Sequence, residues 1–426
     1  MIQTVENIGE KLVSMLTYDA SQPLIFSSGL FLFLFAGFLF FYGFTRRAPM
    51  ARIVYVILFS LYFYYKSSGI YFLLLVFASV SDYWIAHAIY KVRTQRAKYW
   101  LVGLSVLVNL GMLGYFKYTN FLIEIANNLF GQGFLNFQNI FLPVGISFFV
   151  FQSMSYTIDI CRGQLKPLNN WADYLFYLSF FPQLVAGPIV RAKDFIPQIR
   201  QNPLRVTREM FGMGVFLILI GLFKKAVISD YISLNFVDRI FDEPLLYSGF
   251  ECLMGIYGYA LQIYCDFSGY SDMAIGIALL LGFRFPKNFD APYKSATITE
   301  FWRRWHISLS SWLRDYLYIS LGGNRKGKLR TYGNLLVTMV LGGLWHGAAI
   351  RFILWGTLHG VALALHKLWM AVVPGAKASG AQMHWWSRAA GVFFTFNLVC
   401  LGWLMFRAES MQTVELMLHQ IFSNFN

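Results

Sequence analysis

The stretch LFLFLFAGFLFFYG, residues 30–43, carries no charged side chain and shows no alternation of polar with apolar residues. Blocks of the same kind recur along the chain, such as VFLILIGLF at residues 215–223. A helix needs about 20 mostly apolar residues to cross a bilayer, whereas the strands of a membrane barrel alternate polar and apolar residues. These blocks therefore predict membrane-spanning helices.

The composition of the whole chain agrees with this prediction. Of 426 residues, 57% are hydrophobic and 13% are charged, whereas soluble globular domains carry about 25% charged residues. This difference excludes an ordinary cytosolic enzyme. The length allows roughly ten to twelve crossings. Because no repeat, low-complexity tract or linker interrupts the chain, we predict a single all-α, polytopic integral-membrane domain over residues 1–426.

The formal net charge of +14 is interpreted as membrane topology, since basic residues concentrate in the cytoplasmic loops of membrane proteins. Basic clusters follow the first predicted span, at residues 45–52, and the third, at residues 91–98. This pattern predicts an N-terminus outside the cytoplasm and no nucleic-acid partner. No small-residue cleavage pattern follows the first apolar block, so that span is expected to be retained. The four cysteines have no CxxC spacing and predict neither disulfides nor a zinc site.

The middle of the chain is less regular than its beginning. Residues 171–184 are too few to span a membrane and are interrupted by Pro182, which favours a re-entrant or half-buried element. Such backbone is tolerated at membrane depth only where protein buries it or where it lines a cavity. Residues 251–283 are interpreted as one or two helices broken near Gly269.

Three polar clusters interrupt the apolar blocks, and ionisable residues at membrane depth are functional candidates. The first cluster is YCDFSGYSD, residues 264–272, with the carboxylates of Asp266 and Asp272 and the hydroxyl of Ser268. These side chains either line a site or cap the free amides of a helix break. The sequence leaves both interpretations open.

The second cluster, residues 299–316, has the periodicity of an amphipathic helix. At helical spacing, one stripe is formed by Trp302, Trp305, Leu309, Leu313 and Tyr316, and a second by Arg303, Ser310 and Arg314. His306 lies on the boundary between them. The segment is either an interfacial helix anchored by tryptophans and arginines or part of a site. A glycine-containing basic loop follows at residues 321–330, either as a cytoplasmic surface or as a contact for a phosphate-bearing donor.

The third cluster is LGGLWHGAA, residues 341–349, where His346 is the lone ionisable residue among glycines and apolar residues. Small residues allow helices or a substrate to approach closely. A neutral imidazole can take a proton from a hydroxyl group, as a general base for acyl transfer must. A histidine packed in the core is the alternative. His359 and His366 are interpreted as core residues.

Four motifs, found in order within residues 140–410, make the chain resemble the membrane-bound O-acyltransferase family. They are FFPQLVAGPI at residues 180–189, YCDFSGYSD at 264–272, FWRRWHISLS at 301–310 and GLWHG at 343–347. The continuation DYLYISLGG, residues 315–323, is similar to the branch that contains the membrane subunit of alginate O-acetylation.

The resemblance implies a ring of about ten to twelve tilted transmembrane helices, with re-entrant and amphipathic helices around a central tunnel. In this family His346 matches the essential histidine and His306 a second conserved polar position, so both are expected to be catalytic. The expected donor is a cytoplasmic thioester, acetyl-CoA by similarity to this branch, with no tightly bound cofactor and no metal. The residues expected to bind substrate are Asp266, Ser268, Trp302, Arg303, Arg304, Trp305 and Trp345.

Members of this branch usually pass the acyl group to a separate extracytoplasmic acetyltransferase of the SGNH-hydrolase type, which modifies a polysaccharide. The resemblance therefore implies the bacterial cytoplasmic membrane, such a partner, and an envelope polysaccharide as final acceptor. Alginate-type members continue with further helices beyond the region matching residues 403–407. The sequence up to Asn426 is therefore expected to be a shorter relative or a piece of a longer chain.

Two other functions fit broken helices and carboxylates at membrane depth. One is a transporter or flippase of a lipid-linked or acyl intermediate without chemistry of its own. The other is a scaffold within a polysaccharide synthase complex. Transfer of a labelled acyl group from a thioester separates an acyltransferase from a transporter. For a scaffold, His346→Ala would leave acylation intact, whereas loss of the whole chain would not.

Overall fold

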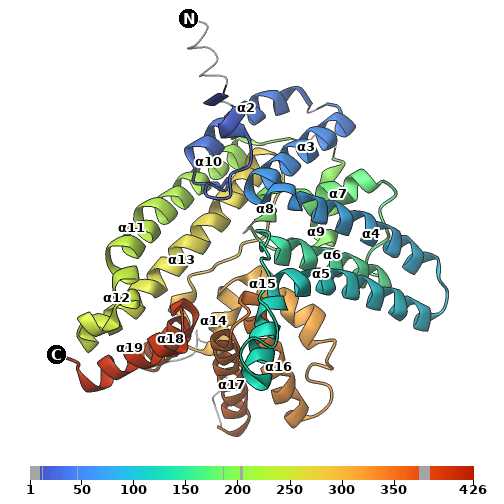
Figure 1. Cartoon of the computed structure of the whole chain (residues 1–426). Helices are drawn as coiled ribbons and strands as arrows, with labels where there is room; N and C mark the ends of the chain where they lie inside the picture. The colour runs from blue at the N-terminus through green and yellow to red at the C-terminus, as the bar shows by residue number, and fades with distance from the viewer. Residues whose placement is uncertain (1–9, 12, 46, 186, 202–204, 374–383) are drawn as a thin grey trace, which may run out of the picture. The chain divides into compact units, whose positions relative to one another are not determined.

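The computed structural model describes residues 10–11, 13–45, 47–185, 187–201, 205–373 and 384–426. All regular secondary structure in these residues is helical (Figure 1). The prediction of an all-α chain is therefore confirmed for the described residues. The chain divides into two compact units, residues 1–219 with 273–285 and residues 220–272 with 286–426. The arrangement in a ring, the number of crossings, the tunnel and the single domain stay predictions.

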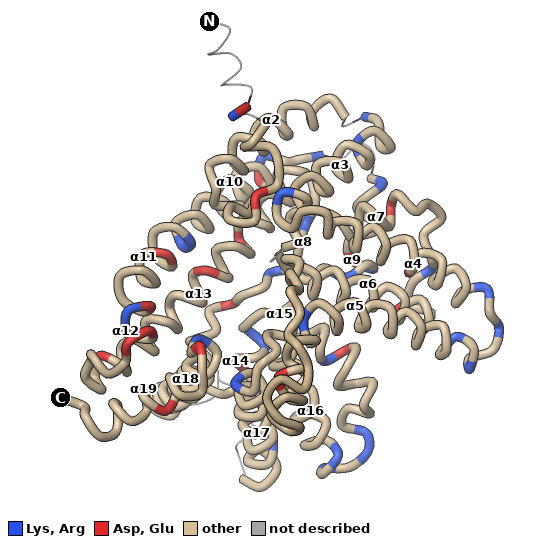
Figure 2. The backbone as a smooth tube through the Cα atoms, viewed as in Figure 1, with Lys and Arg blue, Asp and Glu red and all other residues tan. Residues whose placement is uncertain are grey.

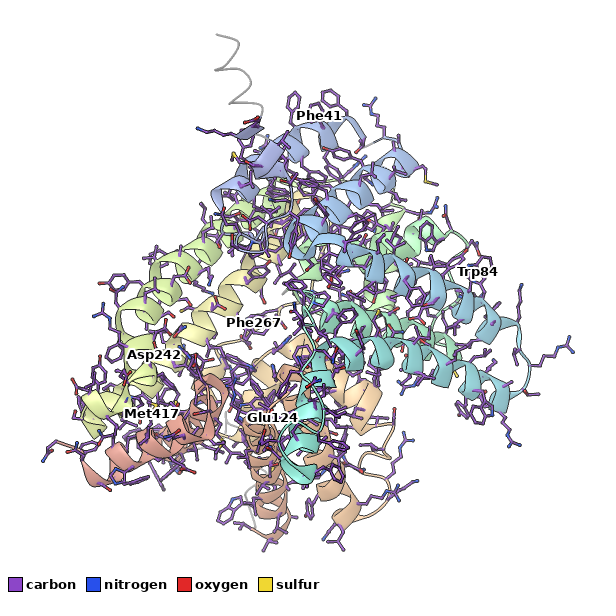
Figure 3. The ribbon with its side chains drawn as sticks, in the orientation of Figure 1. Phe41, Trp84, Glu124, Asp242, Phe267 and Met417 are labelled. Atoms are coloured by element: carbon purple, nitrogen blue, oxygen red, sulfur yellow. The ribbon has the colours of Figure 1, made fainter. Side chains whose placement is uncertain are left out.

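Four helical stretches are long and apolar enough to cross a membrane, judged by length and composition. They are Pro49–Lys91, Gln95–Phe130, Arg208–Asp242 and Trp385–Arg407, and a shorter apolar helix covers Gly29–Thr45. Large apolar side chains remain exposed on such helices. Trp84 is 66% exposed and Phe41 59% exposed, and Figure 3 shows both on the outside of the ribbon. Lipid tails can cover such surfaces at no cost in hydration.

The first unit contains most of the helices before residue 220. They are α2 (Gly29–Thr45), α3 (Pro49–Ser68), η1 (Gly69–Tyr71), α4 (Phe72–Lys91), α5 (Gln95–Phe130), α6 (Ile146–Cys161), α7 (Trp171–Ser179), α8 (Phe181–Leu184), α9 (Ala192–Ile199) and the start of α10 (Arg208–Leu222). The predicted basic loop at residues 91–98 lies at the connection of α4 with α5, where Figure 2 shows a cluster of basic residues. The predicted external N-terminus falls largely on residues 1–9, which lie outside the described part of the chain.

Protein surrounds the short, interrupted segment predicted at residues 171–184. Its last residues are buried, and Phe181 of α8 lies with its ring centroid 5.0 Å from that of Phe59 and 5.8 Å from those of Phe38 and Phe63. Pro182 stands in the first turn of α8, where its missing N–H leaves no hydrogen bond unmade. The expectation that protein packs around this segment is confirmed, while its depth in the membrane stays a prediction.

A buried carboxylate connects three helices of the first unit. Asp82 of α4 is fully buried and accepts hydrogen bonds from Ser105 Oγ (2.7 Å) and Asn109 Nδ2 (2.6 Å) of α5, and from Ser153 of α6. A buried polar group is tolerable only when hydrogen bonds compensate its lost hydration. Donors from two neighbouring helices therefore fix the position of α4.

The second unit contains the elements that carry most of the predicted site. They are η2 (Phe223–Ser229), α11 (Asp230–Ile232), η3 (Ser233–Val237), α12 (Asp238–Asp242), η4 (Pro244–Leu246), most of α13 (Gly249–Leu280), η5 (Pro292–Lys294), α14 (Ile298–Arg304), α15 (Ile307–Trp312), η6 (Leu313–Tyr318), α16 (Lys328–His346), α17 (Ile350–Val372), α18 (Trp385–Arg407) and α19 (Met411–Ser423). Its core is rich in aromatic rings, including Trp305, Trp355 and Trp403.

Two expectations about helix boundaries are wrong. Helix α13 runs unbroken through Gly269. A Cβ atom there would lie 2.8 Å from the carbonyl oxygen of Gly221. Gly269 therefore serves close packing, and no helix break exists for Asp266 or Ser268 to cap. The amphipathic segment 299–316 is not one helix, because the chain turns at His306 between α14 and α15.

Helices α16 and α17 form a tight antiparallel hairpin through glycines (Figure 1). A Cβ atom at Gly343 of α16 would overlap the carbonyl oxygen of Phe352, and one at Gly356 of α17 would overlap that of Met339. The prediction that glycines in residues 341–349 allow close helix contact is thereby confirmed. At these two glycines the backbones of α16 and α17 are in direct contact.

The change Gly343→Ala should therefore lower the free energy of unfolding by about 1–3 kcal/mol, because the added methyl group pushes the two backbones apart. In Gly333→Ala, on the same helix, the new Cβ has no neighbour within 4 Å, and this control should gain up to about 1 kcal/mol from better helix propensity. Thermal unfolding of the detergent-purified variants, followed by size-exclusion chromatography, measures the difference. Equal melting temperatures would contradict the close packing.

Candidate active site

His306 occupies a strained backbone position between α14 and α15. Its φ of 42° and ψ of 56° lie in the left-handed region, which residues with a side chain adopt rarely and mostly where the surrounding structure forces them. Such positions cluster at functional sites. The turn aims the imidazole into the interior, where the residue is 1% exposed.

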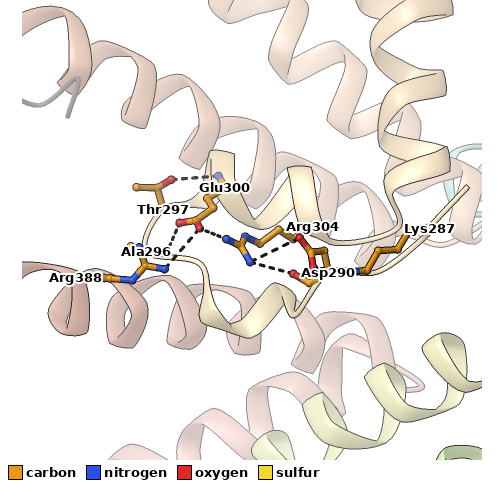
Figure 4. Close-up of polar contacts among 7 residues, drawn as sticks. All are labelled: Lys287, Asp290, Ala296, Thr297, Glu300, Arg304 and Arg388. Carbon is orange, nitrogen blue, oxygen red and sulfur yellow. Dashed lines mark hydrogen bonds and ion pairs between the residues drawn. The ribbon is translucent and has the colours of Figure 1, made fainter. Parts of the chain in front are cut away.

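A polar network holds α14 on the N-terminal side of this turn (Figure 4). Thr297 caps the helix by accepting a hydrogen bond from the Glu300 amide (3.1 Å), and Glu300 accepts one from the Ala296 amide (2.8 Å). Arg304 pairs with Glu300 (2.8 Å) and donates to the Asp290 carbonyl (3.2 Å). The predicted substrate residue Arg304 is thus engaged in anchoring α14.

Asn288 holds the imidazole of His306 in one tautomer. The Asn288 Oδ1 atom accepts from the backbone N–H (3.2 Å) and the hydroxyl (2.9 Å) of Ser308, and lies 3.2 Å from His306 Nδ1. Because Oδ1 is an acceptor, Nδ1 must carry the proton and donate it. His306 Nε2 then presents a lone pair, and no residue in the described part of the chain forms a hydrogen bond with it.

Aromatic rings surround His306 on the sides that Asn288 leaves open. The ring centroid of Phe267, labelled in Figure 3, lies 4.6 Å from that of the imidazole in an edge-to-face arrangement, and that of Phe289 lies 6.3 Å away. His306 is outside the four candidate spans. Burial lowers the pKa of its imidazole to about 3, because the apolar surroundings penalise the charged form. His306 is therefore neutral at physiological pH.

His346 is the last residue of α16, and the extended residue Gly347 follows it. Its imidazole packs against Trp345, Trp355 and Phe406, with ring centroids 4.7, 5.1 and 5.1 Å away. Trp345 also contacts His306, at 6.4 Å between ring centroids. Both predicted catalytic histidines therefore contact one indole, that of Trp345.

A cavity of about 500 Å³ lies beside this aromatic cluster, within the second unit. Its wall includes Trp302 and Arg303 of α14, Arg314 of η6, and Lys367 of α17, together with apolar side chains of α16 and α17. Neither histidine lines it. The cavity combines three basic side chains with an apolar lining.

The remaining predicted site residues have different surroundings. Asp266 pairs with Lys225 Nζ (2.6 Å) and Asp272 with Lys224 Nζ (2.6 Å). Ser268 is 1% exposed, and its hydroxyl has no partner among the described residues. Trp305 packs in the core, 4.8 Å between ring centroids from Trp403. In the described residues, no three His, Cys, Asp or Glu side chains gather as metal ligands would.

Sequence reasoning missed several of these contributors. Asn288 stands in a connection with no recurring pattern, so only the fold shows that it contacts His306 and Ser308. Lys224 and Lys225 are visible as two charges at the end of an apolar block, which could have suggested partners for Asp266 and Asp272. Lys367 lies in an apolar helix four residues after Leu363, and this helical spacing was the available signal for a shared face.

Comparisons with known proteins show which family the chain belongs to. Residues 164–409 match the family model of MBOAT, the membrane-bound O-acyltransferase family. The chain is 43% identical to the probable alginate O-acetylase AlgI of Azotobacter vinelandii over 406 residues, which cover 94% of this chain and 78% of the relative. It is 37% identical to the peptidoglycan O-acetyltransferase of Helicobacter pylori over 92% of this chain and 78% of the relative.

A more distant relative is the teichoic acid D-alanyltransferase of Streptococcus thermophilus, which is 31% identical over 74% of this chain and 77% of its own length. The residues matched by the family model, 164–409, include all four motifs, both histidines and the residues that line the cavity. The chain is therefore a membrane protein and an O-acyltransferase, and it belongs to the membrane-bound O-acyltransferase family.

Proposed function

We propose that this O-acyltransferase takes an acetyl group from a cytoplasmic thioester, acetyl-CoA, and moves it across the bacterial cytoplasmic membrane for O-acetylation of an envelope polysaccharide. The observation that carries the proposal is the pair of imidazoles, His306 and His346, which both contact Trp345. Two relatives named for O-acetylation of alginate and of peptidoglycan support acetyl as the group and a polysaccharide as the final acceptor.

The two histidines differ in what they can do. His346 is partly exposed and takes the proton from the acceptor hydroxyl while its oxygen attacks the thioester carbonyl. A C–O bond forms, the C–S bond breaks, and the leaving thiolate receives the proton from the imidazolium. His306, with its lowered pKa, is neutral at physiological pH and keeps one proton, on Nδ1. Its Nε2 lone pair accepts a hydrogen bond from another donor group of the bound substrates, which leaves the hydroxyl proton to His346, and so orients the substrate.

The cavity supplies a place for the donor. Arg303 and Lys367 contribute positive charge, which matches the phosphates of a coenzyme A thioester, and the apolar lining matches its uncharged arm. Arg314 is already paired with Asp315 (2.6 Å). Trp302 lies at the inner wall. The basic loop at residues 325–330 follows η6 and offers further contacts for phosphate.

The acceptor side requires a partner. We infer that an extracytoplasmic acetyltransferase of the SGNH-hydrolase type receives the acetyl group, and that the N-terminus lies on its side of the membrane. A transporter or flippase without chemistry of its own does not account for membership in an acyltransferase family. Transfer of labelled acetyl by the chain itself separates the two functions.

Membrane vesicles that carry the chain should incorporate label from radioactive acetyl-CoA. In His346→Ala, incorporation should fall about 100-fold or more, because a general base contributes at least that factor. His419→Ala, which removes an exposed histidine of α19, is the matched control and should keep the wild-type rate at equal protein level. Equal labelling in the wild type and His346→Ala would contradict the proposed role of His346.

The change Asn288→Ala should lower kcat about tenfold, by less than His346→Ala, and should leave KM for the donor within about twofold. The reason is that Asn288 sets which nitrogen of His306 carries the proton and makes no contact with the cavity. Asn288→Asp keeps the acceptor but adds a charge that favours protonated His306. Its rate should therefore fall as the pH is lowered, in a range where the wild type is constant. An unchanged kcat in Asn288→Ala would contradict the positioning role.

A further inference from the structure

Trp302 stands between the cavity and His346. Its side chain lines the cavity, and its ring centroid lies 5.7 Å from that of Trp355 and 5.3 Å from that of His359. Trp355 in turn lies 5.1 Å from His346. The rings therefore form a continuous series from the cavity wall to the predicted base.

Helix α16 gives the distance between the cavity and His346. The cavity lining on α16 includes Met339, whereas His346 is seven residues further along the same helix. At 1.5 Å per residue this is about 10 Å. A donor seated in the cavity must therefore extend its acyl group past Trp302 to reach His346.

Little space exists beyond Trp302 for a large acyl group. Trp355 is 1% exposed, His359 fully buried and Trp403 1% exposed. These rings pack against one another, and the centroids of Trp355 and His359 are 4.8 Å apart. A Cβ atom at Gly402 of α18 would lie only 2.8 Å from His359 Nε2, so α18 closes the other side. Close-packed interiors admit extra methylene groups only with strain.

We propose that Trp302 is a specificity-determining residue that limits the transferred acyl group to a short one. This inference rests on the proposed function, in which the cavity holds the thioester donor. The indole of Trp302 packs against Trp355 and His359 and keeps these rings in the space that an acyl group enters on its way to His346. A two-carbon acyl group fits this space, and longer chains are rejected because their additional methylene groups would displace the rings.

Replacing Trp302 does not remove a hydrogen bond from any other described side chain. No described residue accepts a hydrogen bond from its indole nitrogen. Removing a side chain costs most when it strands a hydrogen-bond partner. Trp302→Phe keeps an aromatic ring of smaller volume, and Trp302→Ala removes the ring, so the pair forms a graded series.

The experiment compares radiolabelled acetyl-CoA, butyryl-CoA and hexanoyl-CoA as donors for vesicles of the wild type, Trp302→Phe and Trp302→Ala. The ratio of hexanoyl to acetyl transfer should rise at least tenfold in Trp302→Ala and by a smaller factor in Trp302→Phe. Trp385→Ala, which removes an indole that is 80% exposed on α18, is the control and should keep the wild-type ratio.

Three outcomes overturn the inference. An unchanged ratio in both variants, with acetyl transfer still measurable, refutes the role of Trp302 and leaves the proposed function intact. Equal loss of transfer for all three donors in both variants assigns Trp302 to the reaction itself instead of to selection. Failure of the wild type to transfer acetyl from acetyl-CoA refutes the proposed function, and the inference falls with it.

Discussion

The contact of α16 with α17 through glycine backbones is the constraint on which the site depends. Any side chain at Gly343 or Gly356 would overlap a carbonyl oxygen of the opposite helix. The two helices therefore have one separation and one register available to them. That register places His346, at the end of α16, against Trp355 of α17, and it brings side chains of both helices into the wall of the cavity.

The second histidine reaches the same aromatic cluster by a different route. Helix α14, which is capped and ion-paired, ends at the left-handed turn of His306. Asn288 Oδ1 then accepts a hydrogen bond from His306 Nδ1, which defines the tautomer of the imidazole. Trp345 contacts two imidazoles with different environments: His306 is buried and neutral, and His346 is partly exposed. This difference supports separate tasks for them: His306 orients the bound substrate, and His346 takes the proton from the acceptor hydroxyl.

The sequence alone predicted the helical class and the close approach at the glycines of residues 341–349, because each depends on a local pattern. The catalytic roles of the two histidines came from the resemblance to a family and stay predictions. Three features needed tertiary structure. Gly269 marks close packing against Gly221, whereas isolated glycine suggested a break. The turn at His306 interrupts a segment whose periodicity is helical. Asn288 acquires its role only when its loop is folded against Ser308.

The most direct test of the account is a structure of the protein with a non-hydrolysable thioether analogue of acetyl-CoA. The account predicts phosphate groups near Arg303 and Lys367, the uncharged arm in the cavity beside Trp302, and the acetyl carbonyl within about 4 Å of His346. An analogue bound with its acetyl group far from both His306 and His346, or bound outside the cavity, would contradict the assignment of this cluster as the acyl-transfer site.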